Sequence, residues 1–235
     1  MPSKLRPLGP AWLPLLEKAT ASLVAGGLDV SRLWPAAAER GAALGRLAQL
    51  LDKVATWNAR IDLTAARDER ELVDLYLCDA LVLAVHGARA SRAGRWIDVG
   101  SGAGAPGLAL ALLWPGLRMT LVEPRQKRVA FLRTALGSVG DAALLDVVEA
   151  RSDRIGSFEH DVAISRATFS PEEWLVEGAR LARREVVVLL ARAAPPSLSG
   201  WSVSSVVDYV WPLTAVARQA LVFTREAAQS EGASK

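Results

Sequence analysis

The chain has 235 residues, of which 51% are hydrophobic and 23% charged, a composition typical of a folded protein with a sizeable core. A single cysteine, Cys78, excludes an internal disulfide, and with only two histidines, His86 and His160, a zinc site is not expected. No apolar run reaches the roughly 18 residues of a membrane span, and the start MPSKLRPLGPAW lacks the apolar segment of a signal peptide. We therefore expect a cytoplasmic protein, and the net charge of +3 weakly favours a polyanionic partner.

The first 92 residues show a helical distribution of apolar side chains. Leu44, Leu47, Leu51 and Val54 recur at the three- and four-residue spacing of one helix face. Similar stripes occur before and after them. The sequence therefore predicts a helical extension over residues 1–92.

From residue 93 onward, short apolar runs alternate with amphipathic segments, which predicts strands joined by crossover helices in a parallel sheet. The last two runs are separated by only six residues and predict an antiparallel hairpin. The expected fold is α/β: a Rossmann-like, seven-stranded, mostly parallel sheet over residues 93–225. The polar tail, residues 226–235, is predicted to be disordered. The seven predicted strands are Arg95–Val99, Met119–Glu123, Leu144–Glu149, Asp161–Ser165, Glu185–Ala191, Ser202–Val210 and Ala217–Thr224.

The stretch WIDVGSGAGAPG, residues 96–107, places four glycines between the first strand and the helix after it. Open α/β sheets bind ligands at this edge. Gly102, Gly104 and Gly107 satisfy the spacing of a dinucleotide-binding loop, which would indicate a nicotinamide-dependent oxidoreductase. That interpretation is weakened because neither a catalytic set of His, Lys and Tyr nor a second domain accompanies the loop.

Asp98, two residues before Gly100, favours a second interpretation, in which the loop binds S-adenosylmethionine. A dinucleotide would place two phosphates here, whereas the methionine end of S-adenosylmethionine carries cationic groups that a carboxylate can hold. Glu123, at the end of the second strand, can accept both ribose hydroxyls. The simpler alternative is a tight turn capped by Asp98, which would need only one or two glycines.

Four segments occur in a shared order and spacing: WNARIDLTAARDERELVDLYLCDALV, WIDVGSGAGAPGLALALLWPGLRMTLVEPRQKRVAFLR, VVEARSDRI and HDVAISRA. They resemble the bacterial small-subunit ribosomal RNA guanine-N7 methyltransferases, the glucose-inhibited division B family. The resemblance runs from about Trp57 to Ala167 and continues more loosely to Arg225. It implies a class I S-adenosylmethionine-dependent methyltransferase fold preceded by amino-terminal helices, and methylation of guanine 527 of 16S ribosomal RNA at N7.

The resemblance also implies site residues. Gly100 and Ala105 would line the cofactor, and Ser152 and Asp153, after the third strand, would hold the adenine. A carboxylate suits the adenine amino group, which is a hydrogen-bond donor. Arg166, after the fourth strand, would lie at the cofactor and face the incoming base.

The chain departs from the family in the half expected to face RNA. Leu75 and Tyr76 stand where homologues have Arg-His, Ala80 stands in place of a serine, and Arg192 in place of a lysine. The cofactor half is well kept. These departures leave open a methyltransferase of the same fold with another substrate.

Guanine N7 carries an in-plane lone pair and no proton, so the expected reaction needs no general base. Catalysis would then depend on positioning, for which Arg166 and Arg192 are the candidates. In the segment KRVAFLR, a helix would bury its apolar stripe and leave Lys127 and Arg133 outward, which predicts an RNA-binding surface that also includes Arg192. We expect a monomer that acts on 16S ribosomal RNA or a small-subunit precursor, with no metal and no membrane partner.

Overall fold

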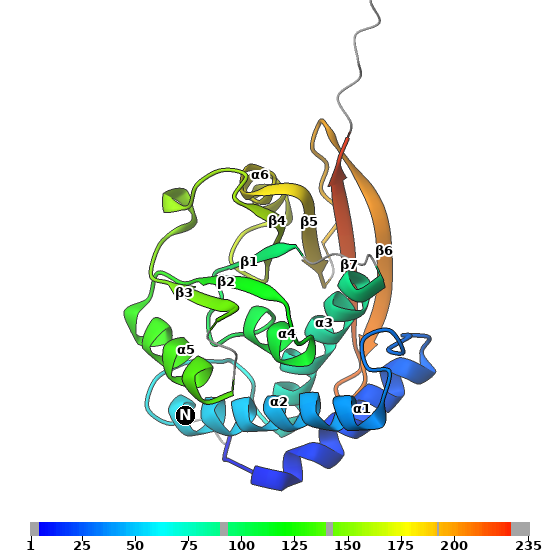
Figure 1. Cartoon of the computed structure of the whole chain (residues 1–235), viewed down its shortest axis with the longest axis vertical. Helices are drawn as coiled ribbons and strands as arrows, with labels where there is room; N and C mark the ends of the chain where they lie inside the picture. The colour runs from blue at the N-terminus through cyan, green and yellow to red at the C-terminus, as the bar shows by residue number, and fades with distance from the viewer. Residues whose placement is uncertain (1–4, 90–93, 140–142, 192, 227–235) are drawn as a thin grey trace, which may run out of the picture.

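Seven strands form one sheet in the order β3-β2-β1-β4-β5-β7-β6, as Figure 1 shows. The computed structural model describes residues 5–89, 94–139, 143–191 and 193–226. The predicted residues 227–235 of the tail lie outside this range. The strands are β1 (Arg95–Val99), β2 (Arg118–Val122), β3 (Leu145–Val148), β4 (His160–Ser165), β5 (Ala182–Leu190), β6 (Trp201–Trp211) and β7 (Val216–Arg225).

The sheet confirms the predicted topology. Strands β1 to β5 pair with one another in parallel, and β7 pairs antiparallel with both β5 and β6. Strand β1 is buried along Trp96–Val99, as expected for a central parallel strand covered on both faces. All seven predicted strands are present, with ends that shift by three residues or fewer. The carboxyl ends of β1 and β4 therefore meet at one edge of the sheet.

Helices cover both faces of the sheet. Two short 3-10 turns, Gly9–Ala11 and η2 (Ser152–Arg154), complete the set. In the view of Figure 1, α6 lies above the sheet and the other helices lie below it. Ser170 is the N-cap of helix α6 (Pro171–Leu181), and its hydroxyl and Glu173 form a reciprocal capping box. The helices are α1 (Trp12–Ala25), α2 (Ala37–Asn58), α3 (Glu69–Arg89), α4 (Gly107–Leu113), α5 (Gln126–Val139) and α6 (Pro171–Leu181).

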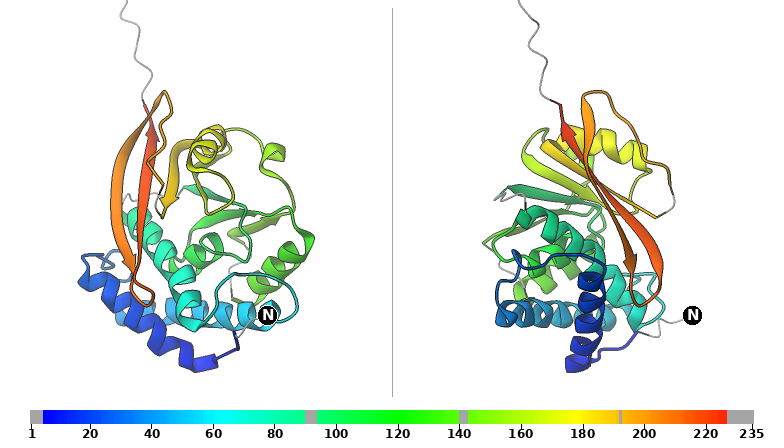
Figure 2. Two further views of the ribbon diagram at one scale, coloured as in Figure 1. Left: turned by 180° about the vertical axis from the view of Figure 1, so that it is seen from behind. Right: turned by 90° about the vertical axis from the view of Figure 1, so that its right-hand side faces the viewer.

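The amino-terminal helices share a core with the sheet. One cluster of buried side chains includes Trp12 on α1, Leu47 on α2 and Leu121 on β2, and a second lies between the sheet and α6. The two views of Figure 2 show α1 to α3 packed against the base of the sheet and the β6–β7 hairpin. The described residues 5–89 thus share a core with the sheet, and the division into a helical extension, residues 1–92, and a methyltransferase domain, residues 93–225, stays a prediction. No helix within the described ranges is long and apolar enough to cross a membrane.

Helix α3 ties the β6–β7 hairpin to the rest of the protein. Asp74 on α3 is fully buried, and its carboxylate accepts hydrogen bonds from the Leu213 amide at 3.1 Å and the Thr214 hydroxyl at 2.7 Å. A buried carboxylate without partners is strongly destabilising. Asp74 therefore holds the turn of the β6–β7 hairpin against α3.

Two glycines in helices give a matched test of packing. A β-carbon on Gly87 in α3 would lie 2.2 Å from the Trp114 ring, whereas one on Gly137 in α5 would meet nothing within 4 Å. We expect Gly87→Ala to lower the free energy of unfolding by about 1–3 kcal/mol through overpacking. Gly137→Ala should raise it by up to about 1 kcal/mol through helix propensity. Urea denaturation of both variants measures the difference, and equal effects would contradict the contact at Trp114.

Candidate active site

A cavity of about 560 Å³ lies where the glycine loop meets α3, the segment after β4 and the β6–β7 hairpin. This is the sheet edge at which α/β proteins bind ligands. Four arginines and one glutamate are among its lining residues, so the wall is cationic. The cavity is lined by Leu63–Arg67, Glu71, Leu75, Tyr76, Gly100–Ala103, Ala105, Arg128, Arg166–Thr168, Trp211, Thr214, Val216 and Arg218.

Glycine is favoured at the loop positions for different physical reasons. Gly100, Gly102 and Gly104 have φ values of 72°, 58° and 90°, in the left-handed region that favours glycine. A β-carbon on Gly107 would lie 2.4 Å from a carboxylate oxygen of Asp98. A β-carbon on Gly102 would meet no neighbour closer than 3.8 Å, so Gly102 is the glycine with open space above it.

Asp98 lies beneath the loop and not in the cavity. Its side chain is almost fully buried, and Oδ2 accepts a hydrogen bond from the Gly107 amide at 3.1 Å. Burial raises the pKa of the Asp98 carboxyl to about 7, partly offset by the Gly107 hydrogen bond. The carboxylate holds the loop, as in the capped-turn alternative, and contact between Asp98 and the methionine end of a cofactor stays a prediction.

Glu123 also holds the loop. It follows directly after β2 and is buried, with Oε2 accepting from the Gly102 amide and Oε1 from the Arg125 amide, both at 2.9 Å. Each carboxylate oxygen has a further lone pair. A ribose contact by Glu123 therefore stays a prediction, compatible with its bonds to the loop.

Tyr76 closes the loop from the side of α3. The buried phenol donates to the Ala103 carbonyl at 2.7 Å, and burial raises the Tyr76 pKa, which keeps the hydroxyl protonated. In the described part of the chain, the amides of Ala103 and Ala105 have no hydrogen-bond partner, and both residues line the cavity. Two backbone donors without partners, on residues that line a cavity, fit an anionic group such as a carboxylate.

Ser152 and Asp153 form the η2 turn after β3 and do not line the cavity. The Arg180 guanidinium on α6 holds this turn, donating to the Ser152 and Ile155 carbonyls at 2.8 Å each. Contact between Ser152 or Asp153 and an adenine remains a prediction. No local pattern indicates this contact of Arg180, because its partners lie 25 and 28 residues away along the chain.

Arg166 lines the cavity as predicted. Its Nη1 donates to the Leu75 carbonyl at 2.9 Å and lies 3.5 Å from Asp79 Oδ2. One end of the guanidinium is thus held by α3. The remaining N–H groups of Arg166 make no hydrogen bond within the described ranges.

Several lining residues were not predicted. The Arg218 guanidinium carbon lies 4.1 Å from the centre of the Trp211 ring, a cation–π arrangement. Arg128 on α5 is the residue nearest to open space above Gly102, with Nη1 at 3.8 Å. Arg128 adjoins the predicted Lys127, so helical phase could have singled it out. No local signal indicates Arg218, because the approach of the hairpin to the loop is set by tertiary packing.

Two of the three predicted RNA-binding residues lie apart from the cavity. Lys127 and Arg133 are exposed on α5, which buries the predicted stripe, but neither lines the cavity. Arg192 lies outside the described residues. Within those ranges, no group of three or more His, Cys, Asp or Glu side chains could hold a metal ion.

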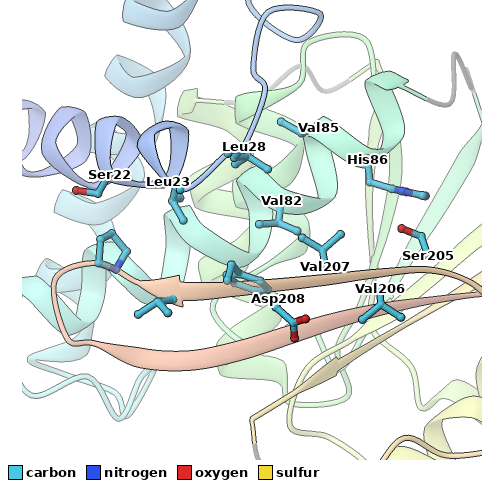
Figure 3. Close-up of a pocket in the computed structure, with 15 residues that line it drawn as sticks. Ser22, Leu23, Leu28, Val82, Val85, His86, Ser205, Val206, Val207 and Asp208 are labelled. Atoms are coloured by element: carbon cyan, nitrogen blue, oxygen red, sulfur yellow. The ribbon is translucent and has the colours of Figure 1, made fainter.

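A second hollow, of about 730 Å³, lies between the end of α1, α3 and β6. Figure 3 shows aliphatic side chains along it, including Leu23, Val82 and Val207, with His86 at one end. It contains no residue of the glycine loop. The cavity at the loop is therefore the candidate active site.

Solved structures of similar architecture are methyltransferases. Magnesium protoporphyrin IX methyltransferase from Synechocystis PCC 6803 with bound SAH aligns with a TM-score of 0.51 and 13% identity, over 63% of this chain and 82% of that chain. At this identity the likeness concerns the fold alone. The fold is that of a class I S-adenosylmethionine-dependent methyltransferase.

The family described as rRNA small subunit methyltransferase G (GidB) matches residues 43–197. The Ribosomal RNA small subunit methyltransferase G of Myxococcus xanthus is 31% identical over 196 residues, 77% of this chain and 88% of its own. The protein of that name from Halorhodospira halophila is 38% identical over 138 residues, 59% of this chain and 63% of its own. The chain belongs to this family, which confirms the resemblance drawn from the sequence.

The buried Asp98 predicts a pH-dependent stability. The folded-state pKa of Asp98, about 7, lies above its ordinary value of 3.8. Between these pH values the folded protein therefore holds a proton on Asp98 that the unfolded chain has released. The Asp98 contribution to the free energy of unfolding should therefore fall as the pH rises from about 4 to 7. Asp98→Asn should remove this fall, as measured by urea denaturation at pH 5 and pH 7.5. Identical pH dependence in the two proteins would contradict the burial of a titrating Asp98.

Proposed function

We propose that this protein transfers a methyl group from S-adenosylmethionine to N7 of a guanine in 16S ribosomal RNA. The observation that carries the proposal is the cavity walled by arginines at the glycine loop, and the loop itself lies inside the family-matched segment. The substrate is proposed to be 16S ribosomal RNA or a small-subunit precursor, and the enzyme a cytoplasmic monomer. The aligned part spans 63% of the Halorhodospira protein, and its printed name supports the assignment to ribosomal RNA.

The residues present fit the cofactor. The free amides of Ala103 and Ala105 would bind its carboxylate, and the open space above Gly102 would admit it. Glu123 would accept the ribose hydroxyls. Ser152 and Asp153 would hold the adenine after a shift toward the cavity. When bound, S-adenosylmethionine supplies a methyl group on a sulfonium, which is a good leaving group.

The cavity offers positioning and no general base. Glu71, the carboxylate in its lining, is ion-paired with Arg67, and this pairing lowers the pKa of Glu71. Tyr76 keeps its proton, and its hydroxyl donates a hydrogen bond to the Ala103 carbonyl. A nucleophile with a lone pair and no proton to lose, such as guanine N7, suits such a site. Holding that nucleophile at reacting distance can contribute about 7–11 kcal/mol to the barrier reduction.

The base must leave its stack to enter the cavity. Arg128, Arg166 and Arg218 line the cavity, and cationic side chains there can bind the phosphates or the guanine O6 of an extruded nucleotide. Lys127 and Arg133 on the outer face of α5 would bind flanking phosphates. Arg192 is proposed as a further RNA contact from its place in the sequence.

Two alternatives remain distinct from this proposal. A changed substrate is favoured by Leu75 and Tyr76, which replace the Arg-His pair of the family. The Tyr76 phenol is hydrogen-bonded to the Ala103 carbonyl of the glycine loop. A nicotinamide-dependent oxidoreductase is disfavoured by membership of a methyltransferase family. Titration calorimetry with S-adenosylhomocysteine and with NAD separates the cofactors.

The decisive experiment compares ribosomal RNA from a deletion strain and its parent by methylation-sensitive reverse transcription. We expect one 7-methylguanine of 16S ribosomal RNA to be lost on deletion. Purified protein with S-adenosylmethionine should restore the mark on RNA or subunits from the deletion strain. If no mark is lost, the changed-substrate alternative replaces the proposal.

A carboxylate that holds both the loop and the ribose should be sensitive to neutralisation. We expect Glu123→Gln to weaken S-adenosylhomocysteine binding by about 1.5–3 kcal/mol, because a charge-assisted acceptor is lost. Glu17→Gln, an exposed position on α1, is the matched control and should bind normally. Calorimetry measures both, and wild-type affinity in Glu123→Gln would remove Glu123 from the site.

A further inference from the structure

One buried carboxylate, that of Asp79, contacts Arg166 directly and Arg218 through Trp211. Asp79 on α3 is 2% exposed. Its Oδ1 accepts from the Tyr209 hydroxyl at 2.8 Å and from Trp211 Nε1 at 2.9 Å, while Oδ2 lies 3.5 Å from Arg166 Nη1. The hairpin and the segment after β4 thus meet at one side chain.

The contacts of Asp79 set the direction of Arg166. Nη1 of Arg166 is committed to Asp79 and the Leu75 carbonyl, and both belong to α3. Because a guanidinium is planar, fixing one nitrogen fixes the plane of the others. The remaining donors of Arg166, which lines the cavity, are thereby held in one orientation.

The same carboxylate sets the direction of Arg218 through Trp211. The indole Nε1 is anchored to Asp79, and the Arg218 guanidinium lies over the indole ring at 4.1 Å. Nε of Arg218 is buried with no hydrogen-bond partner among the described residues. Arg218 is therefore a cation held in the cavity wall by stacking and not by an acidic partner.

We propose that Asp79 is a positioning residue for methyl transfer, which orients Arg166 directly and Arg218 through Trp211 toward the acceptor oxygens of the target nucleotide. This inference rests on the proposed function, since it assumes an RNA nucleotide in the cavity. Arg166 and Arg218 carry two positive charges, and Asp79 supplies one negative charge beside them. This excess of positive charge favours an anionic or carbonyl-bearing ligand. Asp79 itself is too buried to touch that ligand.

A comparison with Asp74 separates the positioning of Arg166 and Arg218 from the docking of the hairpin on α3. Like Asp79, it is a buried aspartate of α3 that binds the hairpin, through Leu213 and Thr214. Unlike Asp79, it contacts no arginine among the described residues. Asp74→Asn is therefore the matched control for Asp79→Asn.

The test measures urea stability, S-adenosylhomocysteine affinity, and kcat and KM for RNA in both variants. Both should be destabilised. We expect Asp79→Asn to lower kcat/KM for RNA by about tenfold to a hundredfold, as for a small misplacement of positioning groups. Asp74→Asn should stay within about twofold of the wild type per folded molecule. In an Arg166→Ala background, Asp79→Asn should cost less than it does alone, because part of its effect passes through Arg166.

Equal kcat and KM in the two aspartate variants would overturn the proposal and leave Asp79 a docking residue. If Asp79→Asn does not fold, Trp211→Phe carries the test: it removes the indole donor to Asp79 and keeps a ring beneath Arg218. It should raise KM for RNA, and an unchanged KM would overturn the proposal. A wild-type protein that methylates no ribosomal RNA would instead reject the proposed function, and this inference with it.

Discussion

A helix buried along most of its length has to satisfy its polar side chains inside the protein, and α3 does so with two other parts of the fold. Asp74 and Asp79 bind the β6–β7 hairpin, and Tyr76 binds the glycine loop. Removing one partner of a buried charged group is strongly destabilising. The loop, the hairpin and the helix therefore depend on one another, and the cavity lies where they meet.

This constraint matches the chemistry proposed for the site. The carboxylates near the cavity are engaged: Asp98 with the Gly107 amide, Glu123 with the Gly102 amide, and Asp79 with the hairpin. They hold backbone and side chains in place instead of moving protons. A reaction whose nucleophile loses no proton can use a site built in this way, since its rate depends on geometry.

Local pattern predicted the fold closely and the site in part. Strand β1 has the predicted ends, since alternation, apolar runs and the glycine loop are short-range signals. The complete burial of Asp98 and the place of Arg218 in the cavity wall could not be predicted. Burial of Asp98 depends on how the loop folds over it, and Arg218 reaches the cavity only because α3 holds the hairpin. Such contacts join distant segments and leave no periodicity in the sequence.

The distances along the chain between these partners affect when the cavity can form. Asp79 lies 130 residues before Tyr209, and Asp74 lies 140 residues before Thr214. Contacts between distant segments form late, because the chain must first close large loops. During synthesis, α3 emerges long before the hairpin that supplies hydrogen-bond donors to Asp74 and Asp79. The nascent protein therefore carries these two aspartates without their hairpin partners until almost its whole length has been translated, and it acquires a complete cavity only when the last strand has paired.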